Sequence, residues 1–389
     1  MGARYFNDPA PWADEEVIMF ADSVARFVAD VAPPERLARW REDGLVERSA
    51  WRQAAAAGLL GVSVATDYGG AGGDFRHEAV IIRELGVAGI EGWGIHLHNA
   101  ICAPYIEKYG TEEQRRRWLP KLVSGELIAA IAMTEPGAGS DLQGIRTTAR
   151  RQGNGYVING QKTFITNGQH AELIIVVAKT DPGAGSKGIS LLVVETKDVT
   201  GFRRGRNLDK VGLEMGDTSE LFFDDVFVPA DSVIGGIEGR GLYQLMEQLP
   251  KERLMIALES LAMIEAAMRH TIDYAAQRRA FGERILDFQN TQFKLAECKT
   301  EATIARIFCD ECVGRLSAGT LDAATASMAK YWVSEAAQRI VDACQQLFGG
   351  YGYMTEYPIA QMYKDVRVKR IYGGTTEIMK LLIARTLEA

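Results

Sequence analysis

The chain lacks long apolar runs, an excess of basic residues and a high cysteine content. No apolar stretch approaches the length of a membrane span, so we expect no transmembrane helix. A net charge of −7 argues against a nucleic-acid partner, because neutralising phosphates requires a basic face. Residues 1–16, MGARYFNDPAPWADEE, lack the apolar segment of a signal peptide, which favours a cytoplasmic protein.

Cysteine is scarce and odd in number, with five residues in a chain of 389. Without a secretion signal, reduced thiols are the better interpretation. Cys309 and Cys312 form a C-x-x-C within a long helical pattern, and no second pair or histidine cluster lies near them in sequence. We therefore interpret them as buried or half-buried helical thiols and expect no metal site.

The residue pattern of the sequence changes twice, from helical periodicity to short strand-like runs and back, which predicts an α+β protein with three domains. We expect an N-terminal α-helical domain over residues 1–126, a middle β domain over 127–236 and a C-terminal helical bundle over 237–389. Near the start, apolar residues recur every three or four positions after Asp14, as on one face of a helix. Further helices are expected over 49–57, 75–90, 93–109 and 112–123, the last with a capping box at Thr111 and Gln114.

The middle region consists of short β-branched or aromatic runs separated by Gly, Asn and Asp, which is typical of strands. The runs are LIAAIAM, GYVING, QKTFIT, ELIIVVAK, GISLLVVE and SELFFDDVFV, and they end near Pro229. Helical periodicity then returns and predicts long helices near 240–275, 290–318 and 322–348. Several long helices with apolar stripes favour a bundle.

A glycine pair opens the last helix, in the stretch IYGGTTEIMK at 371–380. Gly373 and Gly374 allow backbone conformations that a Cβ would forbid, and Thr375 or Thr376 can cap the helix that follows. The free N–H groups of such a helix start suit a phosphate or a polarised carbonyl. The stretch therefore predicts a cradle, but position 373 supplies no catalytic side chain.

Two stretches of the middle region are candidates for contact with a ligand. The loop AMTEPGAGSDLQG, at 132–144, offers hydroxyls at Thr134 and Ser140 and can wrap a flat heterocycle or a phosphate. It lacks the spacing of a Rossmann dinucleotide loop. In KTFITNG, at 162–168, Phe164 and Thr166 share one face at strand periodicity and could back a flavin ring, although on this stretch alone an ordinary half-buried strand is the better explanation.

A carboxylate interrupts the apolar stripe of the helix expected near 240–275. Glu252 lies three residues after Leu249 and four before Ile256, and the stripe also contains Leu245 and Met263. Burial there would raise its pKa towards the range of a working base. The alternative is a surface glutamate paired with a neighbouring basic residue of LPKERL, and the stretch alone leaves both open.

Two further stretches carry weaker signals. The basic pair in QRRAFG, at 277–282, could hold a pyrophosphate, although arginine on a helix usually faces solvent. The glycines of QQLFGGYGY, at 345–353, end a long helix and leave room for a bulky ligand.

Taken in order, these stretches resemble the acyl-CoA dehydrogenases over nearly the whole chain. MTEPGAGSDLQG is similar to the first signature of that family, and QLFGGYGYMTEYP with Asp365 is similar to the second. The resemblance implies an N-terminal helical domain, a middle β-barrel or sandwich and a C-terminal four-helix bundle. It also implies bound FAD, an acyl-CoA substrate, an electron-transferring flavoprotein as partner, and a homotetramer built as a dimer of dimers.

The resemblance also locates the base. Most of the family places its glutamate in Tyr-Glu-Gly-Thr, where this chain has Tyr372-Gly373-Gly374-Thr375. The long-chain and isovaleryl branches place it on a helix before Arg-Leu, which Glu252 matches, and the wording LPKERLMIA is most similar to the long-chain branch. The implied reaction is removal of the α-proton by Glu252 and of a β-hydride by the flavin, giving a trans-2-enoyl thioester. An acyl-thioester oxidase, a flavin monooxygenase or an enzyme acting on carrier-protein thioesters stays open.

Family contacts transfer to this sequence position by position. Contacts to FAD are implied for Ile131, Met133, Thr134, Ser140, Phe164, Thr166, Arg278, Phe281, Gln289, Gln346, Gly350, Thr375 and Glu377. Contacts to acyl-CoA are implied for Ser140, Tyr243, Arg253, Gly373 and Gly374. Those from Arg278 through Gly350 reach the FAD of a neighbouring subunit. Gln361 departs from the second signature, where a basic residue is usual, and this puts a local helix contact in doubt. We interpret His96 and His98, in the helix expected to end the acyl cavity, as structural.

Overall fold

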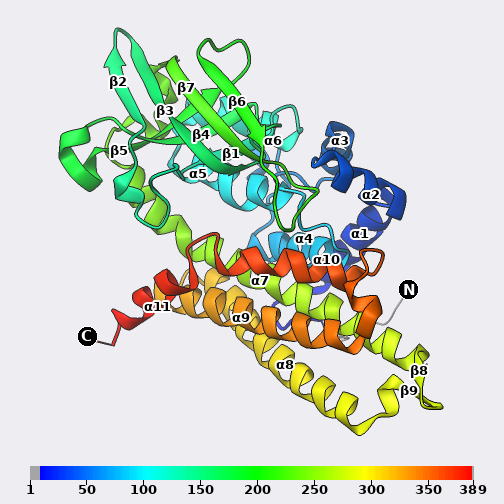
Figure 1. Ribbon diagram of the computed structural model, residues 1–389. Helices are drawn as coiled ribbons and strands as arrows, with labels where there is room; N and C mark the ends of the chain where they lie inside the picture. The colour runs from blue at the N-terminus through cyan, green and yellow to red at the C-terminus, as the bar shows by residue number, and fades with distance from the viewer. Residues whose placement is uncertain (1–8, 388–389) are drawn as a thin grey trace.

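The N-terminal part of the molecule is helical, and its helices pack beside one end of a β-sheet (Figure 1). The computed structural model describes residues 9–387. The helices are α1 Glu15–Val31, α2 Pro34–Asp43, α3 Arg48–Ala56, α4 Phe75–Val87, a π-helical segment Leu97–Cys102, α5 Ala103–Tyr109 and α6 Glu112–Val123.

Helix starts in this region follow the predicted caps. The Asp14 carboxylate accepts a hydrogen bond from the backbone N–H of Val17, so α1 begins where expected. Thr111 and Gln114 form the complete capping box of α6, each side chain accepting from the backbone N–H of the other. Both satisfy N–H groups that a helix start leaves without intrahelical partners.

The helix expected over 93–109 is present in its second half but is not uniformly α-helical. Residues Leu97–Cys102 have π-helical hydrogen bonding, and α5 follows directly. Pro104 has no N–H to donate to the carbonyl of Ala100, which interrupts the α-helical ladder there. A π segment of this kind often lies at a functional site, and this one ends three residues before Tyr105.

The middle region is one seven-stranded sheet, with strand order β1-β4-β2-β3-β7-β6 and β5 paired to β4. Its strands are β1 Ala129–Ala132, β2 Thr148–Gln152, β3 Gly155–Thr166, β4 Leu173–Lys179, β5 Ile189–Glu195, β6 Phe202–Asn207 and β7 Thr218–Pro229. The runs GYVING and QKTFIT form one strand, β3. β2 and β6 were not predicted, because TARRQ and FRRGRN are arginine-rich and carry no apolar alternation.

The prediction that Phe164 and Thr166 lie on one face of a regular strand needs correction. The pairing of β3 with β7 shifts register between Lys162 and Ile165, and Phe164 has a φ of 61°. Regular strand alternation therefore does not hold at this point. Phe164 nevertheless emerges from the sheet with 66% of its surface exposed, while Ile165 is buried.

The C-terminal part is a set of long helices lying below the sheet in Figure 1. It comprises α7 Gly241–Gln277, β8 Arg279–Ala280, β9 Glu283–Arg284, α8 Gln289–Ser317, α9 Ala323–Leu347, α10 Pro358–Asp365 and α11 Thr376–Ala384. α7 is central: it continues through Pro250, and every residue from 252 to 268 is buried. It runs from beneath the sheet to the β8–β9 hairpin (Figure 1).

Two of the negative expectations concern thiols and membrane spans. Cys309 and Cys312 are free and buried in α8, as predicted. Across residues 9–387, no helix combines the length and the apolar character that crossing a membrane demands.

His98 is a structural histidine, as predicted. Its ring is fully buried; Nδ1 accepts from the backbone N–H of Ala129 at 3.0 Å, and Nε2 lies 3.1 Å from the carbonyl of Leu122. This arrangement uses the neutral tautomer with the proton on Nε2. Burial lowers the pKa of His98 to about 4.

Because that pKa lies below the value in the unfolded chain, His98 stabilises the fold fully above about pH 6.5 and loses this contribution as pH falls towards 4. Between pH 7.5 and 5 the loss amounts to about 2 kcal/mol. We expect His98→Gln, whose amide can make both hydrogen bonds, to reduce the fall in thermal unfolding midpoint between these pH values. An equal fall in both proteins would contradict this assignment.

Candidate active site

Glu252 is buried in the middle of the molecule. It lies on α7 with 5% of its surface exposed, and its Oε1 accepts a hydrogen bond of 2.9 Å from the hydroxyl of Tyr105 on α5. The surface alternative, in which Glu252 pairs with a neighbouring basic residue, is therefore wrong. The anomaly in the apolar stripe is a real buried carboxylate.

Three carboxylates share the buried part of α7, and their partners differ. Glu265 forms salt bridges with Arg83 and Arg306, at 2.9 and 3.5 Å. Glu259 lies 3.4 Å from the ammonium of Lys369. Within residues 9–387, Glu252 alone of the three has no salt-bridge partner.

The lack of a paired cation has an electrostatic consequence. Burial raises the pKa of Glu252, and the Tyr105 hydrogen bond with the charges of Lys251 and Arg253 opposes the rise only in part. In Glu259, burial acts the same way, but neighbouring positive groups hold the pKa below its usual value. A carboxylate with a raised pKa is the better proton acceptor, so Glu252 has the character of a general base.

The predicted glycine cradle faces this helix. Gly373 and Gly374 have φ values of 61° and 97°, and Thr375 caps α11 by accepting from the N–H of Ile378. A Cβ added at Gly373 would collide with Cδ1 of Ile256, which is one turn beyond Glu252. The backbone at 373 therefore approaches α7 next to the buried carboxylate.

The cradle is held in place from two sides. The ammonium of Lys330, on α9, donates to the carbonyl of Gly374 at 2.6 Å. The hydroxyl of Tyr372 donates to Glu259 at 2.5 Å, and Lys369 lies between Glu259 and Glu91. Since Lys330 and Lys369 are both fully buried, these contacts are shielded from water and hold the backbone of the loop in place.

A second buried pair anchors the loop after β1. Lys162 donates to the carbonyl of Met133 at 3.0 Å and to the carboxylate of Glu135 at 2.9 Å. Glu135 also accepts from the backbone N–H groups of Arg146 and Thr147, so both ends of the loop are tied. Burial opposes ionisation of Glu135, yet these donors keep its pKa below its usual value.

The anchored loop leaves its polar residues open. Thr134 accepts from the N–H of Thr163, which brings the loop beside the end of β3 that carries Phe164. Ser140 is exposed, and nothing lies within 4 Å of a Cβ built at Gly137 or Gly139. Ile131 and Met133 join Ile256 and Tyr372 in the main apolar cluster. Of the residues implied for one half of the FAD site, Ile131 and Met133 thus share an apolar cluster with α7 and the cradle, while the contact of Thr134 with Thr163 brings Phe164 beside the same loop.

The other implied FAD residues lie elsewhere. Arg278, Phe281 and Gln289 follow the end of α7, and Arg278 stacks over the ring of Tyr351, 5.5 Å from its centroid. Gln346 and Gly350 are exposed at the adjacent end of α9. This end of the bundle carries the β8–β9 hairpin, opposite to α11 in Figure 1.

The two implied CoA contacts on α7 differ in exposure. Tyr243 is 55% exposed near the start of α7, under the guanidinium of Arg240. Arg253 is buried, and its Nη1 donates weakly to Ser327 at 3.3 Å. The structure therefore places Tyr243 on the surface and Arg253 inside, beside Glu252.

Gln361 does not break the local helix contact that its departure from the second signature put in doubt. Its amide donates to Asp365 at 2.9 Å, and Asp365 accepts from the backbone N–H of Leu213. The amide thus takes the place of a basic partner for the carboxylate.

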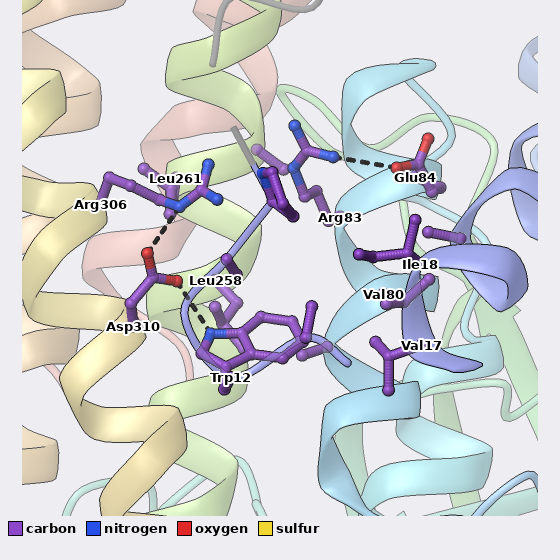
Figure 2. Close-up of a pocket in the computed structure, with 16 residues that line it drawn as sticks. Trp12, Val17, Ile18, Val80, Arg83, Glu84, Leu258, Leu261, Arg306 and Asp310 are labelled. Atoms are coloured by element: carbon purple, nitrogen blue, oxygen red, sulfur yellow. Dashed lines mark hydrogen bonds and ion pairs between the residues drawn. The ribbon is translucent and has the colours of Figure 1, made fainter. Parts of the chain in front are cut away.

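The apolar cavity drawn in Figure 2 is separate from this site. Its volume is about 180 Å³, and it lies between the N-terminal segment, α4, α7 and α8. Leu258 and Leu261 line it from the side of α7 turned away from Glu252. Its rim charges are paired, for example Arg306 with Asp310, which also accepts from Trp12 (Figure 2).

Sequence reasoning missed Tyr105, Lys330 and the Lys162–Glu135 pair. Tyr105 meets Glu252 from 147 residues away, and Lys330 reaches Gly374 across 44 residues. No local pattern signals such contacts. Only Lys162 had a detectable sign, since a lysine stands inside an otherwise strand-like run.

Three family models match the chain in order. They are the N-terminal, middle and C-terminal domains of acyl-CoA dehydrogenase, matching residues 14–126, 130–226 and 239–388. A mitochondrial long-chain specific acyl-CoA dehydrogenase from Sus scrofa is 46% identical over 371 residues, covering 95% of this chain and 86% of that protein.

Solved structures agree. An acyl-CoA dehydrogenase from Geobacillus kaustophilus is 49% identical with a TM-score of 0.95, covering 98% of this chain and 100% of that one. A glutaryl-CoA dehydrogenase from Mycobacterium smegmatis in complex with FADH2 is 29% identical with a TM-score of 0.89, covering 96% and 95%. On this likeness, which extends over the whole described fold, the chain belongs to the acyl-CoA dehydrogenases, FAD-using oxidoreductases that act on CH–CH bonds.

Proposed function

We propose that this enzyme converts a long or branched acyl-CoA to the trans-2-enoyl-CoA with FAD as cofactor and passes the electrons to an electron-transferring flavoprotein. The observation that carries the proposal is Glu252, a buried carboxylate without a paired cation beside a glycine cradle. The placement of this base and the likeness to a long-chain specific relative support the acyl class.

The residues present fit a bound flavin. Phe164 offers an exposed ring beside Thr166 and the open loop 133–140, and such a ring can pack against a flat ligand. The start of α11 offers backbone donors next to Thr375 and Glu377. FAD supplies, when bound, an acceptor for the hydrogen that leaves the β-carbon with its electron pair.

Proton removal is the task of the chain itself. The α-proton of a thioester is weakly acidic, so its removal requires donors at the carbonyl oxygen where negative charge develops. We assign the backbone N–H of Gly373, in the cradle, as the donor to that oxygen. Gly374, which has no side chain, allows the thioester to come close to the backbone. Glu252, one turn from Ile256, then takes the proton from the α-carbon.

Glu377 is a weaker candidate for the base. It is exposed in the first turn of α11. Hydrogen bonds from its own backbone N–H and from Thr375 lower its pKa. A carboxylate stabilised in its ionised form at a helix start suits cofactor contact better than proton abstraction.

The second set of FAD residues supports an assembly of subunits. From Glu252 to Arg278 the helix extends about 39 Å, which is longer than a single FAD molecule. The residues near Glu252 and those near Arg278 can therefore contact the same FAD only if they come from two different subunits. Phe281 is 98% exposed at the tip of the β8–β9 hairpin, with the positive φ of 52° that bulky residues disfavour. We propose a homotetramer, a dimer of dimers, in which Phe281 contacts a neighbour.

The first prediction concerns FAD. We expect the purified protein to be yellow and to hold about one FAD per subunit, measured by absorbance after release of the flavin. Phe164→Asn keeps a residue that tolerates positive φ but removes the ring, and should weaken FAD binding by about tenfold. Phe227→Asn removes an exposed ring elsewhere on the sheet and should leave it unchanged. Tight FAD binding by Phe164→Asn would contradict the assignment.

The second prediction concerns assembly. Asparagine is favoured at the tip of a two-residue hairpin, so Phe281→Asn should relax the hairpin itself. It should nevertheless shift sedimentation towards smaller species and lower the FAD content, because the contact with the neighbour is lost. Phe281→Tyr keeps an aromatic ring and should retain the sedimentation and the FAD content of the wild type. An active, FAD-loaded monomer would rule out the shared cofactor site.

The third prediction concerns the base. Glu252→Gln should keep FAD and bind acyl-CoA but slow flavin reduction by on the order of 10²–10⁴-fold, because an amide cannot accept the proton. Glu377→Gln should affect FAD content more than the rate. Anaerobic bleaching of the flavin by a panel of acyl-CoAs measures both. A wild-type rate in Glu252→Gln would transfer the assignment to Glu377.

A further inference from the structure

Tyr105 meets the carboxylate of Glu252 inside the molecule. It lies on α5, fully buried, and donates to Oε1 at 2.9 Å. No other hydrogen bond to Glu252 is made within the described residues, so Oε2 stays available. The contact joins two helices that lie 147 residues apart in sequence.

We propose that Tyr105 is a positioning residue for proton abstraction, holding Glu252 by Oε1 in its ionised form and leaving Oε2 to receive the α-proton. The inference rests on the proposed role of Glu252 as the base. It assigns to α5, a helix of the N-terminal part of the chain, a contribution to the chemistry of α7.

The choice of a phenol as partner has a physical reason. A salt bridge, as between Glu259 and Lys369, would stabilise the ionised carboxylate and make it a poor proton acceptor. Without a donor, burial would leave the carboxyl protonated and unable to act. One neutral hydrogen bond lies between these limits, since it favours the charged form by less than a cation would.

The surroundings allow Tyr105 to act as a donor at every pH at which the enzyme would be assayed. Burial and the nearby Glu252 raise the pKa of Tyr105 well above its usual value, so the hydroxyl keeps its proton. Burial likewise raises the pKa of Cys102, one turn earlier and facing Glu252, which keeps that neighbour neutral.

The charged groups near Glu252 and its neighbour Lys251 come from α4, α5, α7 and α9. Glu78 on α4 and Glu107 on α5 interact with Lys251, and burial raises the pKa of Glu78 to about 7. Burial lowers the pKa of Lys251 to about 8 and that of Lys330, beyond Arg253, also to about 8. Both titrate on the alkaline side, whereas Arg253 stays charged. The acid limb of a pH profile therefore reports buried carboxyl groups, Glu252 and Glu78, and the test follows the part of that limb that moves when the hydroxyl beside Glu252 is removed.

The test is the pH dependence of Tyr105→Phe, which removes only the hydroxyl. Activity requires ionised Glu252, so it rises as pH passes the pKa of this group. Loss of the hydrogen bond should move the midpoint of the acid limb of kcat/KM upward by about one unit, a loss of about tenfold below both midpoints that recovers above them. Tyr109→Phe is the control: its ring lies 6.1 Å from that of Tyr105, but its hydroxyl serves Glu247.

A second readout isolates the proton step. An acyl-CoA without β-hydrogens, 3,3-dimethylbutyryl-CoA, can exchange its α-hydrogens with D2O but cannot be oxidised. Mass spectrometry of the exchange should show the same upward shift in Tyr105→Phe and no shift in Tyr109→Phe. FAD content and the unfolding midpoint serve to confirm that Tyr105→Phe is folded.

The outcomes separate this inference from the base assignment. An equal loss at every pH, or no change in the acid limb, would overturn the role of Tyr105 while leaving Glu252 as the base. Rapid exchange in Glu252→Gln would overturn the base assignment itself, whatever Tyr105→Phe does. A shift confined to Tyr105→Phe, with exchange abolished in Glu252→Gln, supports both.

Discussion

The burial of α7 on every side between residues 252 and 268 is the constraint on which the rest of the structure depends. A helix that buries every residue from 252 to 268 cannot turn its carboxylates to water, so each must find a partner on another element. Glu265 takes Arg83 and Arg306, from α4 and α8. Glu259 takes Lys369 and Tyr372, next to the cradle.

These partners explain how a structural helix also serves a chemical site. The contacts of Glu259 with Tyr372 and of Lys330 with Gly374 place the loop backbone against α7. Among residues 9–387, the Glu252 carboxylate accepts a hydrogen bond only from the neutral hydroxyl of Tyr105, so it keeps the raised pKa that the paired Glu259 lacks. The same burial that stabilises the fold thus leaves one carboxylate with a raised pKa, which is the group we propose as the base.

Much of the fold could be predicted because its signals are local. The caps at Asp14 and Thr111 and the long apolar stripes depend on residues within a few positions of each other, and the helices lie within a few residues of their expected bounds. β2 and β6 were missed because strands made of arginine carry no alternation.

The residues of the candidate site likewise divide into those with a local signal in the sequence and those without one. The cradle and the buried Glu252 were predictable, since glycines and a charge on an apolar stripe are visible in the sequence. Tyr105 was not, because its meaning comes from a contact formed only when distant helices pack. The left-handed backbone at Phe164 was also missed, because it arises where β3 loses register with β7.

The collision between a Cβ at position 373 and Ile256 has an evolutionary meaning. A glutamate introduced at 373 would need a left-handed backbone, which glycine alone adopts without cost, and a shift of the Cδ1 atom of Ile256. A glutamate at this position would therefore carry backbone strain before it could act. In evolutionary terms, that strain favours keeping the proposed base on the helix over moving it to the loop.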